Sequence, residues 1–477
     1  MLSEQPIIKF GTDGWRGIIA DDFTGANVRL VTQAIAEYFT VNVHGQKPIV
    51  IVGYDNRSQS EYFAAEVAKI VAMNSLLPIL SSQACSSPAV SFMVQHVQAC
   101  GGIMVTASHN PPNFNGLKVK AHYGGSASPA IIKVIEDRLQ CLISDQRHPK
   151  TPARVMDVVE YRDLSSDYLG HLSTLVDLRQ IATANLRIVV DSMHGSGAGY
   201  LSSLLRQGGC ENVIEIRGDR NPSFGGVNPE PIEQNMAALS EAVVHAGAHI
   251  GIALDGDADR LGAVDSEGNF VDCHRIFAVL LRHLVEHRHW TGSVVKTVST
   301  TRMIDRLAEL YGLRLHETPI GFKHICDLML AGDVLIGGEE SGGIGVKNHI
   351  PERDGVLMGL LLLEVMATRN LKLESLISEI MTDVGHHEYA RIDLHPDAVR
   401  MPNIRTMLST VHLTQMAGRE ILEISNLDGT KFNFDDGSWL LVRPSGTEPV
   451  VRVYAECPTR AGVNALLDAG VDLVKHA

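Results

Sequence analysis

Short apolar runs rich in β-branched residues alternate along most of the chain with longer stretches whose apolar residues recur at helical spacing. This alternation is typical of strands and helices stacked in layers. The same order recurs between residues 187 and 255 and again between residues 293 and 338. We therefore expect three α/β domains of similar topology. In the first of them the pattern predicts strands at 48–55, 77–80 and 102–106 and a helix at 61–72.

The last part of the chain has a different pattern. Short strands dominate from residue 385, in ILEISN, TKFNF, SWLLVRP and VVRVYAE, and a final helix is predicted from Arg460. The length of 477 residues suits three or four domains at roughly 100–200 residues each. The polar, Pro-containing stretch 146–157 is the predicted first linker. The expected fold class is α/β, with three mixed α/β domains at 1–150, 151–258 and 259–384 and a smaller α+β domain at 385–477.

Three of the predicted strands run directly into polar loops. GIMVT leads into ASHNPP, GIAL leads into DGDADR, and VLIG leads into GEESGG. Ligands of open α/β sheets bind at the carboxyl ends of the strands. We therefore expect one loop from each domain to line a shared central cleft.

Composition and charge limit the kinds of partner that the protein can bind. With 45% hydrophobic and 20% charged residues the chain resembles ordinary globular proteins, which excludes disorder as its main state. The 41 basic and 55 acidic residues leave a net charge of −14, which repels nucleic acid and acidic membrane. We expect neither as a partner, and an anionic substrate needs a local basic pocket. The longest apolar stretch, 356–363, falls far short of the ~18 residues of a membrane span and predicts a buried helix.

The cysteines and the start of the chain bear on location. Seven dispersed cysteines without a CxxC pair argue against a disulfide scaffold or a Cys-based zinc site. The sequence MLSEQPIIKF has no basic segment followed by an apolar run, as a secretory signal would. We therefore expect a cytoplasmic protein.

The first loop, within TASHNPPNFNGLKVK (106–120), places Ser108 between a buried strand and two prolines. The prolines end regular structure and hold the loop rigid, so the Ser108 hydroxyl is a candidate to carry a phosphoryl group. A Ser/Asn turn is the commoner explanation of such residues, and the GxSxG motif of serine hydrolases is missing. His109 is a candidate to orient substrate or fix the loop. Lys118 can serve as an acid or base near phosphate and metal if its pKa is depressed, although an isolated lysine is usually a solvated charge.

The second loop, DGDADR (255–260), places Asp255, Asp257 and Asp259 on alternate positions. In an extended segment that spacing directs all three carboxylates to one side, where hard oxygen donors suit Mg²⁺. An EF-hand calcium loop is excluded, because Arg260 stands at loop position six and Ser266 at position twelve. A plain acidic turn is a poor explanation, since clustered carboxylates repel without a cation. Arg260 would contact the same phosphate.

The third and fourth loops suit sugar and phosphate. In GGEESGG (337–343), Glu339 and Ser341 suit sugar hydroxyls, and the glycines allow close approach of the backbone; a surface turn is an equal alternative. In RPSGTEPVVRV (443–453), a Ser/Gly/Thr loop lies between Arg443 and Arg452. Backbone N–H groups, hydroxyls and a guanidinium form an anion site, whereas a plain hairpin turn explains neither arginine.

Two further motifs carry less weight. MHGSGAGY (193–200) resembles a dinucleotide-binding loop but has Tyr200 where the last Gly of GxGxxG belongs, so we expect a structural turn. His283 and His287 have the spacing of metal ligands on a helix. His289, Arg282 and Arg288 crowd the same segment, and a solvated helix end is expected instead.

Together with FGTDGWRG near the start, the motifs TASHNPP, DGDADR, GEESGG and RPSGTEP occur in the order and spacing of the α-D-phosphohexomutase superfamily, which the chain closely resembles over nearly its whole length. Within it the chain looks most like the phosphoglucomutase/phosphomannomutase branch. The resemblance implies four domains around one deep cleft and a mobile last domain. It implies that Ser108 is a phosphoserine and that Mg²⁺ is held by its phosphate with Asp255, Asp257 and Asp259.

The resemblance also implies roles for the remaining candidates. Arg16 and Lys118 match the family's catalytic cations, and Glu339 and Ser341 match residues that bind sugar hydroxyls. Lys323 and His324 lie in GFKHI (321–325), the segment that helps to dock the sugar, and either of them could serve as a second acid or base. The expected substrate contacts are thus Arg260, Thr318, Gly321, Lys323, His324, Glu339 and Ser341, and those of the distal phosphate are Arg443, Ser445, Gly446, Thr447 and Arg452.

The implied reaction interconverts glucose 1-phosphate and glucose 6-phosphate through glucose 1,6-bisphosphate. Gly343 stands where several dual-specificity relatives carry His, which favours glucose over mannose. Alternatives are a phosphomannomutase or dual-specificity mutase, a glucose-1,6-bisphosphate synthase, and a non-catalytic sugar-phosphate binding protein. A phosphoglucosamine mutase is less expected, because its sugar loop usually reads GEQSGH. The sequence leaves open whether the protein is a monomer or a homodimer.

Overall fold

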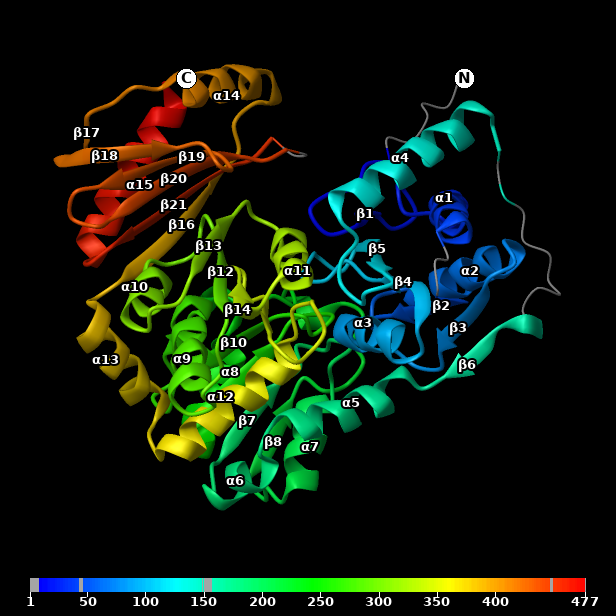
Figure 1. The fold of residues 1–477 in the computed structure, drawn as a ribbon, viewed down its shortest axis with the longest axis horizontal. Helices are drawn as coiled ribbons and strands as arrows, with labels where there is room; N and C mark the ends of the chain where they lie inside the picture. The colour runs from blue at the N-terminus through cyan, green and yellow to red at the C-terminus, as the bar shows by residue number, and fades with distance from the viewer. Residues whose placement is uncertain (1–7, 43–45, 148, 150–156, 447–448, 477) are drawn as a thin grey trace.

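Four sheets follow one another along the chain in the computed structural model (Figure 1), which describes residues 8–42, 46–147, 149, 157–446 and 449–476. The first sheet has the strand order β1-β5-β4-β2-β3-β6. Its strands are β1 (Trp15–Ile18), β2 (Lys47–Tyr54), β3 (Leu77–Ser81), β4 (Ala99–Val105), β5 (Phe114–Ala121) and β6 (Glu160–Arg162). The helices α1 (Gly25–Val41), α2 (Ser60–Met73) and α4 (Pro129–Ser144) share one apolar core with this sheet.

The second sheet, in the order β11-β10-β9-β7-β8, connects to the first through helices. Its strands are β7 (Ile188–Asp191), β8 (Val213–Ile216), β9 (Ile250–Leu254), β10 (Leu261–Val264) and β11 (Phe270–Val271). Five helices accompany the first and second sheets: α3 (Ser87–His96), α5 (Leu164–Leu175), α6 (Leu178–Thr183), α7 (Tyr200–Gly208) and α8 (Ala237–Ala246).

The third sheet has the order β13-β12-β14-β15. Its strands are β12 (Ser293–Thr297), β13 (Leu315–Thr318), β14 (Val334–Gly338) and β15 (Ile344–Val346). The surrounding helices are α9 (Cys273–Glu286), α10 (Met303–Leu310), α11 (Phe322–Ala331), α12 (Gly355–Arg369) and α13 (Leu373–Val384). The predicted apolar helix at 356–363 lies within α12, which is buried in a core shared by the first, second and third domains.

The fourth sheet is antiparallel throughout, in the order β16-β21-β20-β19-β18-β17. Its strands are β16 (Glu388–Leu394), β17 (Gln415–Met416), β18 (Arg419–Ser425), β19 (Thr430–Phe434), β20 (Trp439–Pro444) and β21 (Val451–Cys457). It packs against α14 (Met401–Thr410) and α15 (Arg460–Lys475) in a core of its own. The expected fold class, three mixed α/β domains and a smaller α+β domain, is confirmed.

One strand pattern is repeated in the first three sheets. The orders β3-β2-β4-β5, β8-β7-β9-β10 and β13-β12-β14-β15 each contain three parallel strands followed by one antiparallel strand. The turn between the third and fourth strand is in each case one of the polar loops singled out from the sequence. Equivalent positions in three copies of one topology therefore carry the serine, the aspartates and the sugar loop.

Two predicted domain boundaries do not coincide with the sheets. The boundary at 258 cuts through the second sheet, because β10 and β11 pair with β9. After the boundary at 150, β6 still pairs with β3 of the first sheet. Much of the predicted linker 146–157 lies outside the described residues. Apolar periodicity shows where a strand is, whereas strand pairing is a long-range property that it does not report.

Every helix of the described residues is too short or too polar to cross a membrane.

Candidate active site

The serine loop follows β4 and is closed against the rest of the first domain. Ser108 is fully buried and has a φ of 51°, a backbone conformation that few residues other than glycine adopt. Its backbone N–H donates to Thr106 Oγ1 at 2.8 Å, and its hydroxyl donates to Asp255 Oδ2 at 2.8 Å. The hydroxyl also lies 3.4 Å from His109 Nδ1. The loop thus aims the Ser108 hydroxyl at the aspartate loop of the second domain.

A buried arginine that the sequence patterns did not single out holds this loop. The Nη2 of Arg57 donates to the carbonyls of Ser108 at 2.6 Å and Asn110 at 2.5 Å. Its Nη1 donates to the carbonyls of Pro111 at 2.7 Å and Phe114 at 3.2 Å. One guanidinium therefore bonds four carbonyls, three in the loop around Ser108 and one at the start of β5. The available signal was its position, directly after the apolar strand in YDNR.

The three aspartates gather as their spacing predicts. Asp255, Asp257 and Asp259 are fully buried, and one oxygen of each lies within 4.8 Å of the others. Burial and the two neighbouring carboxylates raise the pKa of Asp255 well above its usual value. The Oδ1 atoms of Asp257 and Asp259 have no hydrogen-bond partner among the described residues. Three hard oxygen donors with unpaired lone pairs fit a divalent cation.

The aspartate and serine loops are in direct contact. A side chain at Gly256 would collide with the carbonyl oxygen of Ser108, so only glycine lets the two backbones approach this closely. The loop 193–199 supports the aspartate loop from the other side, since Ser196 N–H donates to the carbonyl of Gly256 at 3.0 Å. Asn56 donates to the carbonyls of His194 and Gly195 at 3.0 and 2.9 Å. This motif therefore forms a structural turn, as expected.

Two cations and one further carboxylate complete the centre. Lys118 on β5 is buried, with its Nζ 2.8 Å from Asp257, 2.7 Å from Asp259 and 2.9 Å from Asp13. Burial opposes its charge, but these carboxylates outweigh burial and raise the pKa of Lys118. The buried Arg353 contacts Asp13 and lies 2.9 Å from Asp259. Sequence patterns did not single out Asp13 or Arg353, because neither belongs to the loop it contacts.

Further cations surround the serine loop. Arg16 on β1 donates to Asn110 Oδ1 at 2.5 Å. Arg260 is buried, with its Nε 3.7 Å from Asp259 Oδ1. The His109 Nε2 lies 3.9 Å from Glu230, and burial together with the nearby arginines lowers the pKa of His109 well below its usual value. A chain of net charge −14 thus concentrates cations beside Ser108.

The sugar loop reaches the same centre from the third domain. Buried Glu339 accepts the backbone N–H of Gly321 at 3.0 Å and the Nη1 of Arg353 at 3.2 Å. Burial raises the pKa of Glu339 to about 7. Ser341 is half-buried in the turn between β14 and β15. A side chain at Gly343 would meet Arg353 at 2.6 Å, so glycine makes the room that Arg353 fills.

The segment 318–324 lies beside this loop. Thr318 is buried at the end of β13, and its hydroxyl donates to the carbonyl of Pro319 at 3.1 Å. Lys323 and His324 are half-buried in the first turn of α11. Burial, then the neighbouring Lys323, lowers the pKa of His324. The N–H of Gly321 on Glu339 joins this segment to the sugar loop.

The phosphate loop of the fourth domain follows β20. Arg443 and Arg452 face each other across the β20–β21 pair. Arg443 Nε lies 2.9 Å from Asp428, and Arg452 Nε lies 3.6 Å from Asp393. Ser445 N–H donates to the carbonyl of Val450 at 2.7 Å. Gly446 has open space around it, Thr447 lies outside the described residues, and the loop extends from its sheet towards the first domain (Figure 1).

The histidine pair on α9 differs from expectation. His287 is exposed, but His283 is buried, with its Nε2 2.9 Å from Glu364. The solvated helix end that the charged neighbours predicted is therefore wrong for His283, because α9 packs against α12 on that side.

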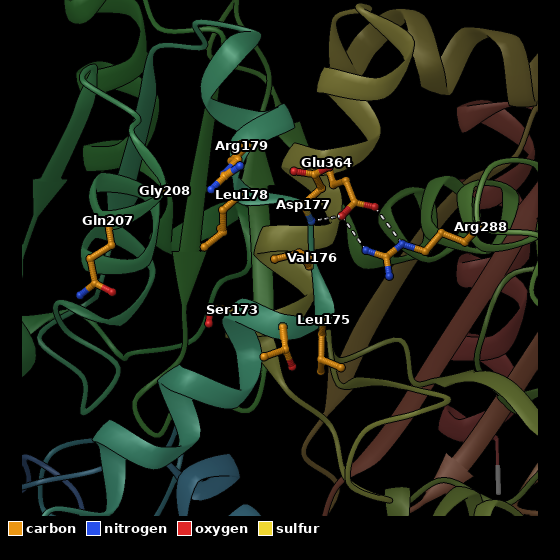
Figure 2. Close-up of a pocket in the computed structure, with 11 residues that line it drawn as sticks. Ser173, Leu175, Val176, Asp177, Leu178, Arg179, Gln207, Gly208, Arg288 and Glu364 are labelled. Carbon is orange, nitrogen blue, oxygen red and sulfur yellow. Dashed lines mark hydrogen bonds and ion pairs between the residues drawn. The ribbon is translucent and has the colours of Figure 1, made fainter.

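A separate hollow of about 720 Å³ lies between the α5–α6 turn and α12 (Figure 2). Its principal charges are paired: Arg288 Nε and Nη2 donate to Glu364 at 2.8 and 2.5 Å, and Asp177 N–H donates to Glu364 at 2.8 Å. Burial disfavours the Glu364 charge, but these bonds and His283 outweigh it and lower the pKa to about 2. One wall of the hollow is therefore an ion-pair seam, and none of the lining residues belongs to the serine or aspartate loop.

Phosphoryl transfer to and from a sugar is the chemistry that this serine, carboxylate and cation cluster suits. Repeated α/β domains that each contribute one loop to such a centre characterise the phosphohexomutases.

Comparison with known proteins agrees. Phosphoglucomutase/phosphomannomutase family models match the chain as α/β/α domain I at 8–143, domain II at 166–268, domain III at 272–384 and the C-terminal domain at 399–473. A phosphoglucomutase/phosphomannomutase of Thermococcus kodakarensis is 29% identical over 474 residues, 98% of each chain. A phosphoglucosamine mutase of Thermobifida fusca is 32% identical over 468 residues, also 98% of each. A solved Thermus thermophilus structure assigned as a phosphomannomutase has 34% identity and a TM-score of 0.86, covering 99% of each chain.

The chain therefore belongs to the phosphoglucomutase/phosphomannomutase family of the α-D-phosphohexomutase superfamily, which confirms the resemblance drawn from its motifs. It is an enzyme of the phosphohexomutase isomerase class. The relatives carry different substrate names, so the sugar is a separate question.

Proposed function

We propose that the protein interconverts glucose 1-phosphate and glucose 6-phosphate through phosphorylated Ser108 and glucose 1,6-bisphosphate. The observation that carries this proposal is the Ser108 hydroxyl, 2.8 Å from the aspartate triad and surrounded by cations. In the first half-reaction the bond from Ser108 Oγ to phosphorus breaks, and a bond from the free sugar hydroxyl to phosphorus forms. The bisphosphate then reorients in the site so that its other phosphate faces Ser108. That phosphoryl group is transferred to the Ser108 hydroxyl, which leaves the isomerised hexose monophosphate.

The aspartate triad fits Mg²⁺, which when bound would polarise the oxygens of the transferring phosphoryl group. The chain's own cations have separate tasks. Arg16 and Arg260 would stabilise negative charge on the phosphoryl group during transfer. In this structure Asp13, Asp257 and Asp259 raise the pKa of Lys118, so Lys118 would exchange the proton of the reacting hydroxyl only once those carboxylates bind another cation. Lys323 or His324 would serve the other half-reaction. Ser108 returns to its phosphorylated state at the end of each cycle.

The sugar and the distal phosphate have their own contacts in this proposal. Glu339 and Ser341 would bind sugar hydroxyls, with the segment 318–324 alongside. The phosphate that does not react would be held by Arg443, Ser445, Gly446, Thr447 and Arg452. Because the two phosphates exchange places, this loop must accept either end of the sugar, and we expect the fourth domain to open between the half-reactions.

The preference for glucose rests on the pair of Glu339 and Arg353. A carboxylate already paired with a guanidinium is a weak partner for the ammonium group of glucosamine, whereas it can still accept hydrogen bonds from neutral hydroxyls. Gly343 leaves the room that Arg353 occupies. Phosphoglucosamine mutase is the second candidate, because a relative of that name is 32% identical over 98% of each chain.

Turnover of the 1-phosphates of glucose, mannose and glucosamine, each with a catalytic amount of its 1,6-bisphosphate, tests the proposal. We expect the highest kcat/KM for glucose 1-phosphate and no turnover by Ser108→Ala. Mass spectrometry after bisphosphate treatment should show one phosphate on Ser108. Preferential turnover of glucosamine 1-phosphate would select the second candidate, and undiminished turnover by Ser108→Ala would contradict the phosphoserine mechanism.

A further inference from the structure

Asp428 joins two loops that the proposed reaction uses, and none of the candidate roles above includes it. It lies in the turn between β18 and β19. Its Oδ1 is 2.9 Å from Nε of Arg443 in the phosphate loop, and its Oδ2 accepts the backbone N–H of Ile320 at 2.9 Å. Ile320 belongs to the segment 318–324 of the third domain. One carboxylate therefore bridges the phosphate-binding domain and the sugar-docking segment.

The turn that carries Asp428 is packed tightly against Arg443. A side chain at the next residue, Gly429, would meet the Arg443 Cα at 2.9 Å and the Val442 carbonyl oxygen at 2.7 Å. The φ of Gly429, 91°, also favours glycine. The turn therefore keeps the carboxylate beside the arginine without needing a long, flexible side chain.

Asp428 and Arg443 form a 2.9 Å ion pair in which the N–H of Nε is not well aligned with the carboxylate. The Arg443 Nε is buried and makes no aligned hydrogen bond among the described residues. Both side chains keep some solvent access, with 15% of Arg443 and 22% of Asp428 exposed. A guanidinium binds phosphate through two parallel N–H bonds, which a poorly aligned carboxylate does not match. Phosphate can therefore displace the carboxylate from Arg443.

We infer that Asp428 is a competing counter-ion: it occupies Arg443 when no phosphate is bound and is displaced when the distal phosphate arrives. This inference rests on the proposed function, in which Arg443 binds that phosphate. Competition between Asp428 and phosphate for Arg443 weakens binding of the bisphosphate. The bisphosphate has to leave the phosphate loop before it can reorient for the second half-reaction. The second bond of Asp428, to Ile320, ties the fourth domain to the sugar-docking segment while the carboxylate is beside Arg443.

The probe is inorganic phosphate, and its binding to the full chain is measured by calorimetry for the wild type, Asp428→Asn, Arg443→Met and the double variant. We expect Asp428→Asn to tighten phosphate binding roughly three- to fivefold, as suits removal of a partly exposed ion pair. Arg443→Met should weaken binding and remove the effect of Asp428→Asn. The matched control is Asp436→Asn, which breaks an ion pair of 2.8 Å to Arg419 in the same domain and should leave phosphate binding unchanged.

Unchanged or weaker phosphate binding by Asp428→Asn overturns the inference, as does an equal tightening in the Arg443→Met background. The inference is also overturned if Arg443→Met binds phosphate as tightly as the wild type. Turnover of glucose 1-phosphate by the wild type is measured in parallel. Its absence would contradict the proposed function while the calorimetry still decides the role of Asp428.

Discussion

Replacing Arg57 with lysine should reduce kcat about a hundredfold and leave the KM for the hexose phosphate nearly unchanged. Arg57 does not contact the reacting hydroxyl; it holds the carbonyls of the loop that carries Ser108. Lysine keeps the positive charge, so buried Asp55, 3.3 Å from the Arg57 Nε, retains a counter-ion. The substitution therefore tests the geometry of the four bonds and not the loss of charge.

The magnitude follows from those bonds. A lysine ammonium offers three N–H groups from a single atom, and we expect one to face Asp55 and two to reach carbonyls. At least two of the four carbonyls then lose a charged donor, at roughly 1.5–3 kcal/mol each. Even the lower value, about 3 kcal/mol in total, corresponds to about a hundredfold lower population of the aligned loop. The substitution leaves the substrate contacts in the third and fourth domains unchanged, so the KM should stay close to that of the wild type.

The assay is steady-state turnover of glucose 1-phosphate, together with the extent of Ser108 phosphorylation after bisphosphate treatment. Arg29→Lys is the matched control, because Arg29 makes a single 2.7 Å pair with Glu66 on the α1–α2 face. It should keep wild-type kcat. A kcat for Arg57→Lys within roughly threefold of wild type would refute the positioning role, and so would a large rise in KM at unchanged kcat.

Three further outcomes follow from the site and its surroundings. Burial raises the pKa of Glu339 to about 7, so the carboxylate that accepts sugar hydroxyls should form as the pH rises from about 6 to 8. The KM measured across this range should therefore fall, and Glu339→Gln should remove the part of the change due to this group. Chelation should abolish turnover and Mg²⁺ should restore it, whereas Asp257→Asn should raise the Mg²⁺ concentration for half-maximal rate roughly tenfold or more; full activity after exhaustive chelation would argue against a metal. Lys120 and Glu352 form a fully buried 2.6 Å pair between the first and third domains, so Lys120→Met should lower the unfolding free energy by about 3–5 kcal/mol, and adding Glu352→Gln should recover part of it in urea denaturation; equal stability of the wild type and Lys120→Met would contradict this reasoning.

Several parts of the site could be predicted because their chemistry lies within one short segment. The three aspartates occupy alternate positions after an apolar strand, so local backbone geometry already brings their carboxylates together. Ser108 is likewise marked by the strand before it and the prolines after it. The sugar loop could be placed for the same reason, since a polar segment that ends a buried strand must emerge at the edge of a sheet.

Other parts could not be predicted, because their partners are distant in sequence. Asp13 and Arg353 are 340 positions apart, and they meet only when the first and third domains close on the second. The position of Arg57 after an apolar strand marks the edge of the sheet, but the sequence does not show that its guanidinium binds the loop around Ser108, 51 positions away. The buried position of His283 depends on α12, so its charged neighbours in the chain were a poor guide.

The sequence by itself determined the class of fold, the repeated strand-and-loop order and the residue types at each loop, because hydrophobic period and turn chemistry act over a few residues. Only the tertiary structure decided which charges meet. It made Lys118 a partner of three carboxylates, Arg353 the neighbour of Glu339, and Asp428 the bridge between the phosphate loop and the sugar-docking segment. The physical reason is that burying a charge requires a counter-charge within a few ångströms, and for Lys118, Lys120 and Arg353 that counter-charge comes at least partly from another domain.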